Sequence, residues 1–304
     1  MLLSIVVPVY KAQNTLLELV ERLLASKPSA FSDIEIVLVD DKSPDDSWLL
    51  INQIARKVPQ VKGILLSRNF GQHHAITAGL DNCNGDWIVV MDCDLQDQPE
   101  EIPKLFEVTQ NGFDLVLAKR HQRQDSFIKK LQSRLFYQFY SYLSGVKQDA
   151  SIANFGIYNR KCIDVFNQMR EPMRAFPPMM KWIGFKSCAI DVIHNDRKDG
   201  KSTYTFSKLL KLALDISIAY SDKPLRMSIG LGLLMSLGAF GFSLYLLYRY
   251  TTGHIIVEGY TSLMVSIWFL SGLVLLFLGI SGLYISRIFD ASKNRPLYII
   301  DKTT

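Results

Sequence analysis

The stretch GDWIVVMDCDLQDQPEE, residues 85–101, joins an apolar run to a series of acidic residues. The run at residues 87–91 has the length and the β-branched content of a buried strand. Because side chains alternate along a strand, Asp92 and Asp94 are expected to project to the same side. Two carboxylates on one face repel each other unless a cation lies between them, and oxygen ligands suit Mg²⁺ or Mn²⁺. Gln96 can add a neutral oxygen.

An Asp-x-Asp sequence after a strand is also common turn chemistry, because aspartate favours loops and helix caps. Taken alone, the three residues 92–94 favour a metal site and an ordinary turn equally. The surrounding sequence has to decide between the two.

Composition narrows the classes of protein to consider. The 304 residues could form one large or two modest domains, and 48% of them are hydrophobic, with the excess in the C-terminal third. The net charge of +5 is mild and there is no long basic run, so a membrane surface is a better partner for the Lys and Arg residues than a nucleic acid. The four cysteines lack a CxxC pair, which predicts reduced thiols rather than a zinc site or a disulfide framework. The first residues lack the pattern of a secretory signal and are expected to form a strand.

Further apolar runs predict a sheet. Strands are expected over residues 2–10, 34–41, 61–67 and 113–119, with helices over 14–24, from Ser43 onward, and over 73–82. This alternation indicates βαβ units and a mostly parallel sheet, in which ligands bind beyond the carboxyl ends of the strands. No GxGxxG or GxxxxGK[ST] loop is present, so a dinucleotide enzyme and a P-loop ATPase are excluded. The expected strand ends contain Pro8, Tyr10, Asp40, Asp41, Arg68, Asp92, Asp94 and Arg120.

The C-terminal third predicts two membrane spans. Residues 227–248 and 259–286 contain no charged side chain, and about 20 apolar residues suffice to cross a bilayer. Lys and Arg flank the outer ends of this pair, so the positive-inside bias places the catalytic domain and both termini in the cytoplasm. Residues 206–221 predict an interfacial helix just before the first span. A second amphipathic helix, at 127–143, fits a membrane-surface role and an ordinary surface helix equally.

Four segments resemble one known family. SIVVPVY (4–10), VDDKSPD (39–45), SRNFGQHHAITAGLD (67–81) and GDWIVVMDCDLQDQPEEIP (85–103), followed by two spans, resemble a family 2 glycosyltransferase of the GT-A fold. More narrowly, the chain resembles the polyprenyl-phosphate glycosyltransferases, the group of dolichyl-phosphate mannose synthase and the bacterial undecaprenyl-phosphate sugar transferases. The resemblance covers nearly the whole chain. It implies a cytosolic α/β GT-A domain over 1–205, a juxtamembrane amphipathic helix over 206–224, and a two-span region with a short cytosolic tail over 225–304.

The resemblance also implies residue roles. Asp92, Asp94 and Gln96 match the Mg²⁺ or Mn²⁺ set that holds the donor diphosphate. Arg120 and Arg134 match arginines that meet the acceptor phosphate. The loop RKDGKSTY at 197–204 resembles one that closes on the diphosphate. The residues implied for the nucleotide-sugar are Pro8, Tyr10, Asp40, Asp41, Arg68, Gly71, Asp92, Arg197, Lys201 and Ser202, and those implied for catalysis are Asp92, Asp94, Asp149 and Arg197.

Departures from the family pattern at three positions limit this transfer of roles. Asp149 is retained, but Asn154 stands where the family often has a second acid, and Gly156 stands where it has an arginine. A general base at position 154 is therefore in doubt, although a lipid phosphate is already an anionic nucleophile. Thr203 replaces the lysine of the closing loop.

The expected reaction is inverting transfer of a sugar from a nucleotide-sugar to polyprenyl phosphate at the inner (plasma) membrane, for cell-envelope glycans. UDP is favoured over GDP by the likeness of FGQHHAITAG and of the two-span tail to the bacterial undecaprenyl-phosphate enzymes. Relatives with this tail suggest a tetramer. Two alternatives remain open. A processive polysaccharide synthase would need a QxxRW motif and usually more spans, and a non-catalytic nucleotide-sugar-binding scaffold would be expected to lose some acidic or arginine positions. The sequence does not specify the sugar.

Overall fold

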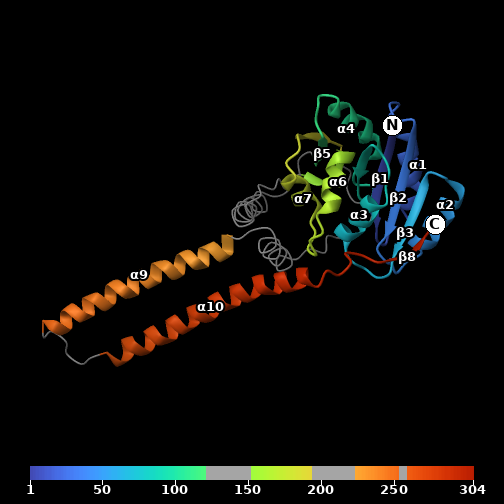
Figure 1. The fold of residues 1–304 in the computed structure, drawn as a ribbon. Helices are drawn as coiled ribbons and strands as arrows, with labels where there is room; N and C mark the ends of the chain where they lie inside the picture. Colours follow the sequence, from blue (N-terminus) through green and yellow to red (C-terminus); the bar gives the residue numbers. More distant parts are fainter. Residues whose placement is uncertain (121–151, 194–222, 253–258) are drawn as a thin grey trace. The chain divides into compact units, whose positions relative to one another are not determined.

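The computed structural model describes residues 1–120, 152–193, 223–252 and 259–304. These residues form two compact units, each described by itself. One unit contains residues 1–120, 152–193 and 295–304, and the other contains residues 223–252 and 259–294. The first holds a sheet with helices and the second holds two long helices (Figure 1).

The sheet of the first unit is mixed but mostly parallel, as the sequence predicts. Parallel pairing joins β4 to β1, β1 to β2, β2 to β3, and β5 to β7, whereas β6 and β8 run antiparallel to their neighbours. The order across the sheet is β7-β5-β6-β4-β1-β2-β3-β8. The strands are β1 (Leu2–Val9), β2 (Asp33–Asp40), β3 (Val61–Leu66), β4 (Trp87–Val90), β5 (Leu115–Arg120), β6 (Ile152–Asn159), β7 (Ser187–Val192) and β8 (Ile300–Thr303).

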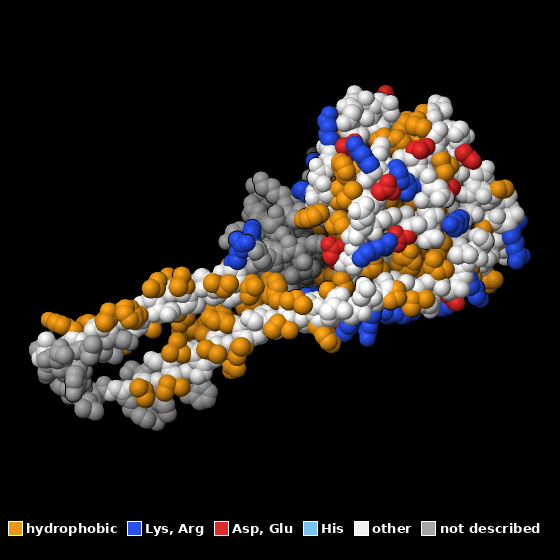
Figure 2. Space-filling view, viewed as in Figure 1, with side chains coloured by type: hydrophobic (Ala, Val, Ile, Leu, Met, Phe, Trp, Pro, Cys, Tyr) orange, Lys and Arg blue, Asp and Glu red, His pale blue; other side chains and the backbone are white. Residues whose placement is uncertain are grey.

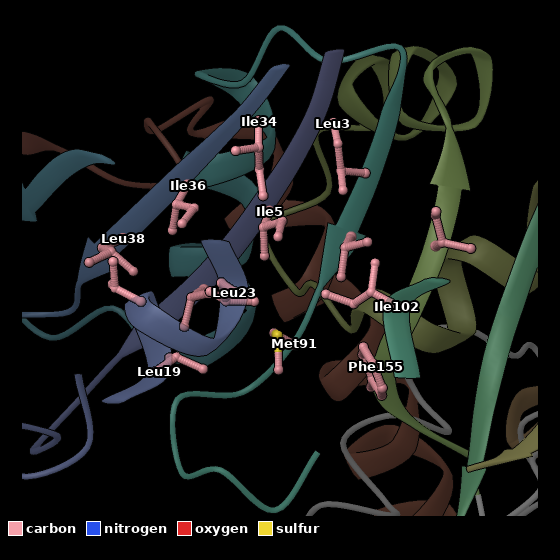
Figure 3. Packing of buried hydrophobic residues seen from close by; sticks show 14 of the residues in the cluster. Leu3, Ile5, Leu19, Leu23, Ile34, Ile36, Leu38, Met91, Ile102 and Phe155 are labelled. Carbon is pink, nitrogen blue, oxygen red and sulfur yellow. The ribbon is translucent and has the colours of Figure 1, made fainter. Parts of the chain in front are cut away.

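Helices cover both faces of this sheet because each buried strand is apolar on both sides. Leu3 and Ile5 of β1 belong to the core cluster that also contains Leu19 and Leu23 of α1 (Figure 3). Val6 points to the opposite face, where Gly79 of α3 packs so closely that a methyl group at Gly79 would collide with it. The helices are α1 (Leu16–Ala25), α2 (Ser47–Lys57), α3 (Gln72–Asp81), η1 (Pro99–Glu101), α4 (Ile102–Thr109), α6 (Arg160–Gln168) and α7 (Phe176–Trp182).

The five expected strands and the mostly parallel α/β sheet are confirmed, and two local expectations are corrected. The helix expected from Ser43 begins at Ser47. Ser43 instead belongs to the loop, since its backbone N–H donates to Asp40 Oδ1 at 2.7 Å and its hydroxyl accepts the N–H of Lys11 at 3.1 Å. The strand expected through Met91 ends at Val90.

Three strands, β6, β7 and β8, are absent from the sequence-based prediction. β8 follows both long helices in the chain, within the segment expected to be a cytosolic tail, and it pairs with β3. β8 is only four residues long and mostly exposed, so it has neither the length nor the alternation by which a strand is recognised from sequence.

The second unit consists of α9 (Lys223–Thr251) and α10 (Tyr260–Ser292). Each contains a segment long and apolar enough to cross a membrane, Leu225–Phe242 and Phe269–Ser292, and neither segment is buried in the structure. Apolar side chains cover the surface of both helices (Figure 2). The pair fits the two predicted spans, whereas the amphipathic helices expected at 127–143 and 206–221 lie outside the described residues.

Candidate active site

The loops that follow β1, β2 and β4 share an uncommon backbone conformation. Lys11, Lys42 and Leu95 have positive φ values of 55°, 57° and 59°. Side chains other than glycine rarely adopt this left-handed region, and such residues concentrate at functional sites. All three lie beyond the carboxyl ends of parallel strands, which is where ligands bind in sheets of this kind.

Asp92 and Asp94 lie in the turn after β4 and are half-buried. Because the strand ends at Val90, strand alternation does not by itself fix where the two carboxylates point. Asp94 Oδ1 accepts the backbone N–H of Gln96 at 3.2 Å, so the turn chemistry considered as an alternative is present. Asp92 Oδ1 accepts from Gln72 Nε2 at 2.7 Å and from Asn154 Nδ2 at 3.4 Å.

Cys93 lies between the two acids, and its side chain is on the core side of the turn. Its side chain packs against the core cluster, and burial raises the pKa of its thiol to about 12. Its carbonyl oxygen accepts from Thr15 Oγ1 at 2.8 Å. The turn is therefore anchored through Cys93. All four cysteines are free thiols, as predicted.

Asp40 and Asp41, at the end of β2, are almost fully buried, with exposed fractions of 0% and 3%. Burial raises the pKa of both carboxyl groups, and hydrogen bonds from backbone N–H groups oppose the shift. Both oxygens of Asp41 accept backbone N–H groups of the β3–α3 loop, from Phe70 at 2.7 Å and from Gly71 at 2.8 Å. Asp40 Oδ2 is buried and accepts no hydrogen bond within the described part of the chain.

The remaining residues implied for the nucleotide differ in exposure. Pro8 is buried within β1, whereas Tyr10 just beyond that strand is 47% exposed. Arg68 is exposed in the β3–α3 loop, and its guanidinium lies over the ring of Phe70 at 4.3 Å from the centroid. Gly71 has φ of +96°, a conformation that disfavours any side chain. The structure thus places Tyr10 in the loop beyond β1 and Arg68 and Gly71 in the loop beyond β3, two parallel strands that both pair with β2.

Several predicted site residues cannot be positioned. Arg120 is the last residue of β5, which runs parallel to β4, so its backbone lies at the same end of the sheet as Asp92. Its side chain, like the whole of Arg134, Asp149, Arg197, Lys201 and Ser202, lies outside what the structure describes.

Sequence reasoning missed Gln72, which is exposed at the first turn of α3 and contacts Asp92. The glutamine lies inside the quoted segment at 67–81, but glutamine has no spacing pattern that announces a role. The neighbouring His73 has a structural contact instead. Its Nδ1 accepts the backbone N–H of Phe176 at 3.3 Å, and burial lowers its pKa to about 4.

The donor set can accommodate a hard divalent cation. Among the described residues there is no cluster of three or more His, Cys, Asp and Glu side chains. Mg²⁺, however, is commonly held by one or two carboxylates together with substrate phosphates. Asp92 and Asp94 can supply two carboxylates of that kind, and the backbone N–H of Gln96 donates to Asp94 Oδ1 in the same turn.

Comparison with known proteins decides the family. Residues 4–166 match the profile of glycosyl transferase family 2. The chain belongs to this family. The family 2 match spans β1 to α6 and includes both acidic pairs. The chain is therefore a glycosyltransferase.

Relatives extend this similarity over the full chain. The family 2 chain is 36% identical to the uncharacterized glycosyltransferase YkcC of Bacillus subtilis, over 99% of this chain and 93% of that protein. It is 35% identical to an undecaprenyl-phosphate 4-deoxy-4-formamido-L-arabinose transferase of Sodalis glossinidius (98% and 92% covered). It is 33% identical to a prophage-derived bactoprenol glucosyl transferase of Shigella flexneri (100% and 98% covered). Among solved structures, S. aureus TarS with UDP-GlcNAc matches with a TM-score of 0.49 at 19% identity, covering 73% of this chain and 68% of that one.

Proposed function

We propose that this glycosyltransferase moves a sugar from a UDP-sugar to undecaprenyl phosphate, with inversion at the anomeric carbon and with Mg²⁺ or Mn²⁺ bound. The observation that carries the proposal is the half-buried Asp92–Asp94 turn at the carboxyl ends of parallel strands, in a chain that also has two apolar helices. The first feature suits a donor diphosphate and the second suits a lipid acceptor.

The proposal of a nucleotide-sugar donor is supported by a buried carboxylate oxygen that has no hydrogen-bond donor among the described residues. A buried carboxylate oxygen without a donor is costly, and Asp40 Oδ2 is such an atom. The N–H and O–H groups of a nucleoside could donate to it. Arg68 and the exposed ring of Tyr10 lie in the loops after β3 and β1, on either side of β2, where they could contact a ribose or a base.

The acceptor side is supported by the relatives and by the helices. Two relatives whose names specify different sugars share a polyprenyl acceptor, which suggests that the acceptor is common to the group and the sugar is not. The apolar surfaces of α9 and α10 would place the enzyme in the membrane that contains such a lipid. By the positive-inside bias we expect the catalytic unit and both termini in the cytoplasm.

The chemistry asks for positioning and charge neutralisation rather than for a strong base. A bound Mg²⁺ or Mn²⁺ would offset the charge of the departing nucleoside diphosphate. Asp92 and Asp94 would hold the ion, with Gln96, and Arg197 is proposed to close over the diphosphate. Arg120 and Arg134 are proposed to bind the acceptor phosphate, and Asp149 to lie at the reacting centre. Asn154 donates a hydrogen bond to Asp92, which fits an orienting role and not a base.

The test is transfer of label from a panel of UDP- and GDP-sugars to undecaprenyl phosphate, with purified full-length protein and either Mg²⁺ or EDTA. We expect label in the organic phase from a UDP-sugar, and loss of that label with EDTA. Label in a polymer would favour a polysaccharide synthase. Nucleotide binding without transfer from any donor would overturn the proposal and favour a scaffold.

A further inference from the structure

The segment 298–304 follows the second apolar helix in the chain. It makes specific contacts with the rest of the first unit, the catalytic unit that contains the sheet. Its strand β8 extends the sheet beyond β3 in antiparallel pairing, with Ile64 opposite Thr303 and Leu66 opposite Ile300. At its far end the backbone N–H of Thr304 donates to the carbonyl of Gly63 at 3.1 Å, and Thr304 Oγ1 accepts the N–H of Gly63 at 2.8 Å. Without β8, the backbone groups of β3 would form the exposed edge of the sheet.

The pairing continues past β3 into the loop at residues 67–71. The backbone N–H of Ser67 donates to the carbonyl of Ile299 at 2.9 Å, so the first residue of the loop is held by this segment. The last two residues of the same loop, Phe70 and Gly71, donate to Asp41. The loop that contains Arg68 is thus fixed at one end by segment 298–304 and at the other end by a buried carboxylate.

Two side-chain contacts flank this loop. Asp301 of β8 forms an ion pair with Lys42 at 3.2 Å, and Lys42 directly follows Asp41 with a left-handed backbone. The hydroxyl of Tyr298 donates to Asp81 Oδ2 at 2.8 Å, at the last residue of α3. Arg170 binds both oxygens of the same carboxylate at 2.8 Å. Segment 298–304 therefore contacts the first residue of the loop, the neighbour of Asp41, and the end of the helix after the loop.

We propose that segment 298–304 is a positioning element of the donor site, which holds the loop at residues 67–71 in the conformation that binds the nucleotide. This rests on the proposed function, because it assigns Arg68 and Gly71 to the nucleotide. If the loop adopts its binding conformation only part of the time, the apparent affinity for the donor falls by that fraction. Loss of the segment should therefore weaken donor binding without a matching effect on the acceptor.

The main variant removes residues 296–304 from the otherwise full-length enzyme. Its first readout is hydrogen exchange at the backbone amides of Phe70 and Gly71, which Asp41 holds and β8 does not touch. Faster exchange at these two amides is expected, together with a donor KM raised about tenfold and an acceptor KM unchanged within about twofold. Lys302→Ala, at an exposed position of β8, is the matched control and should change none of these quantities.

A charge exchange tests the same inference if the shortened chain does not fold. Asp301→Lys should raise the donor KM about twofold to threefold, since the ion pair is half-exposed, and Lys42→Asp with Asp301→Lys should restore it. Unchanged exchange at Phe70 and Gly71 after removal of the segment would overturn the inference. So would an equal rise in donor and acceptor KM. Because exchange is measured without substrate, absence of sugar transfer by the wild type would count against the proposed function alone.

Discussion

Two acidic pairs follow two strands of the same sheet, and their surroundings are opposite. Asp40 and Asp41 at the end of β2 are buried, and each oxygen of the second accepts a backbone N–H group. Asp92 and Asp94 after β4 are half-buried. The contacts defined for Asp92 come from side-chain amides, which can move with a ligand.

The difference separates a residue that holds a loop in place, here called a brace, from a pair that can bind a ligand. Backbone N–H groups of Phe70 and Gly71 donate to the two oxygens of Asp41, so we infer that it acts on the loop at residues 67–71. Asp92 accepts from the side-chain amides of Gln72 and Asn154, within a half-buried turn. Sequence alone makes the two pairs look equivalent, and burial distinguishes them.

The largest effect is expected at the half-buried pair, Asp92 and Asp94. Asp92→Asn keeps the shape of the side chain and an acceptor for Gln72, but removes the charge that a cation requires. Turnover should fall at least about a hundredfold, because a bound cation contributes several kcal/mol and each 1.4 kcal/mol or so is a factor of ten in rate. The melting temperature should stay near that of the wild type. Near-normal turnover in the label-transfer assay would remove Asp92 from the metal site.

At the buried pair, Asp40 and Asp41, we expect a loss of stability in place of a loss of turnover. Asp41→Asn leaves one of the amides of Phe70 and Gly71 without an acceptor, which costs about 1–3 kcal/mol and should lower the melting temperature by several degrees. Turnover at saturating donor should be largely retained. Thermal unfolding followed by tryptophan fluorescence, with kcat measured on the same samples, checks both.

Asp40→Asn is the matched control for this variant, since Oδ1 would still accept the N–H of Ser43. It should unfold nearer to the wild-type temperature but bind donor more weakly if Oδ2 accepts from the nucleotide. A brace role for Asp41 would be wrong if its variant lost turnover without losing stability.

A smaller effect is expected for Gln72, which orients Asp92 from the side. Gln72→Ala removes the 2.7 Å hydrogen bond to Asp92. Loss of a residue that supports a metal ligand typically costs about tenfold to a hundredfold in metal affinity or activity. We expect a shift at the lower end of this range in the Mn²⁺ concentration for half-maximal binding, followed by the electron paramagnetic resonance signal of free Mn²⁺. Unchanged Mn²⁺ binding would show that the contact is incidental.

The smallest effect concerns the stability of the fold at acid pH. Burial lowers the pKa of His73 from 6.5 to about 4. Between these pH values His73 is therefore mostly protonated in the unfolded chain and mostly neutral in the folded chain. Stability should therefore fall as the pH drops from 6.5 toward 4. His73→Asn keeps an acceptor for the backbone N–H of Phe176. In this variant the melting temperature should depend less on pH between these values. The raised pKa values of Asp40 and Asp41 act with the opposite sign, favouring the folded state as they protonate. An unchanged slope in His73→Asn would mean that His73 is not the titrating group.

Much of this fold is legible in the sequence because its central strands are continuous apolar runs with turn residues between them. The run before Asp92 and the run before Asp40 both form strands within one or two residues of the expected bounds. The two apolar helices are equally clear, since length and the absence of charge suffice to find them.

What the sequence does not reveal depends on contacts between distant segments. Gln72 becomes a partner of Asp92 only because α3 begins beside the turn after β4, and Asp41 becomes a brace only because the β3–α3 loop folds back over β2. β8 is too short and too exposed to be recognised without its partner β3. Local patterns therefore predict elements, and tertiary pairing assigns their roles.

The pairing of β3 with β8 also sets an order of events during biosynthesis. The hydrogen bond between Gly63 and Thr304 joins residues 241 positions apart, with both apolar helices between them in the chain. Such long-range pairing forms late, because the intervening chain must first be made and ordered. The ribosome therefore makes β8 only after both apolar helices, and the last edge of the catalytic sheet closes after that. A chain that ends before β8 would leave the backbone groups of β3 exposed to pairing with other chains.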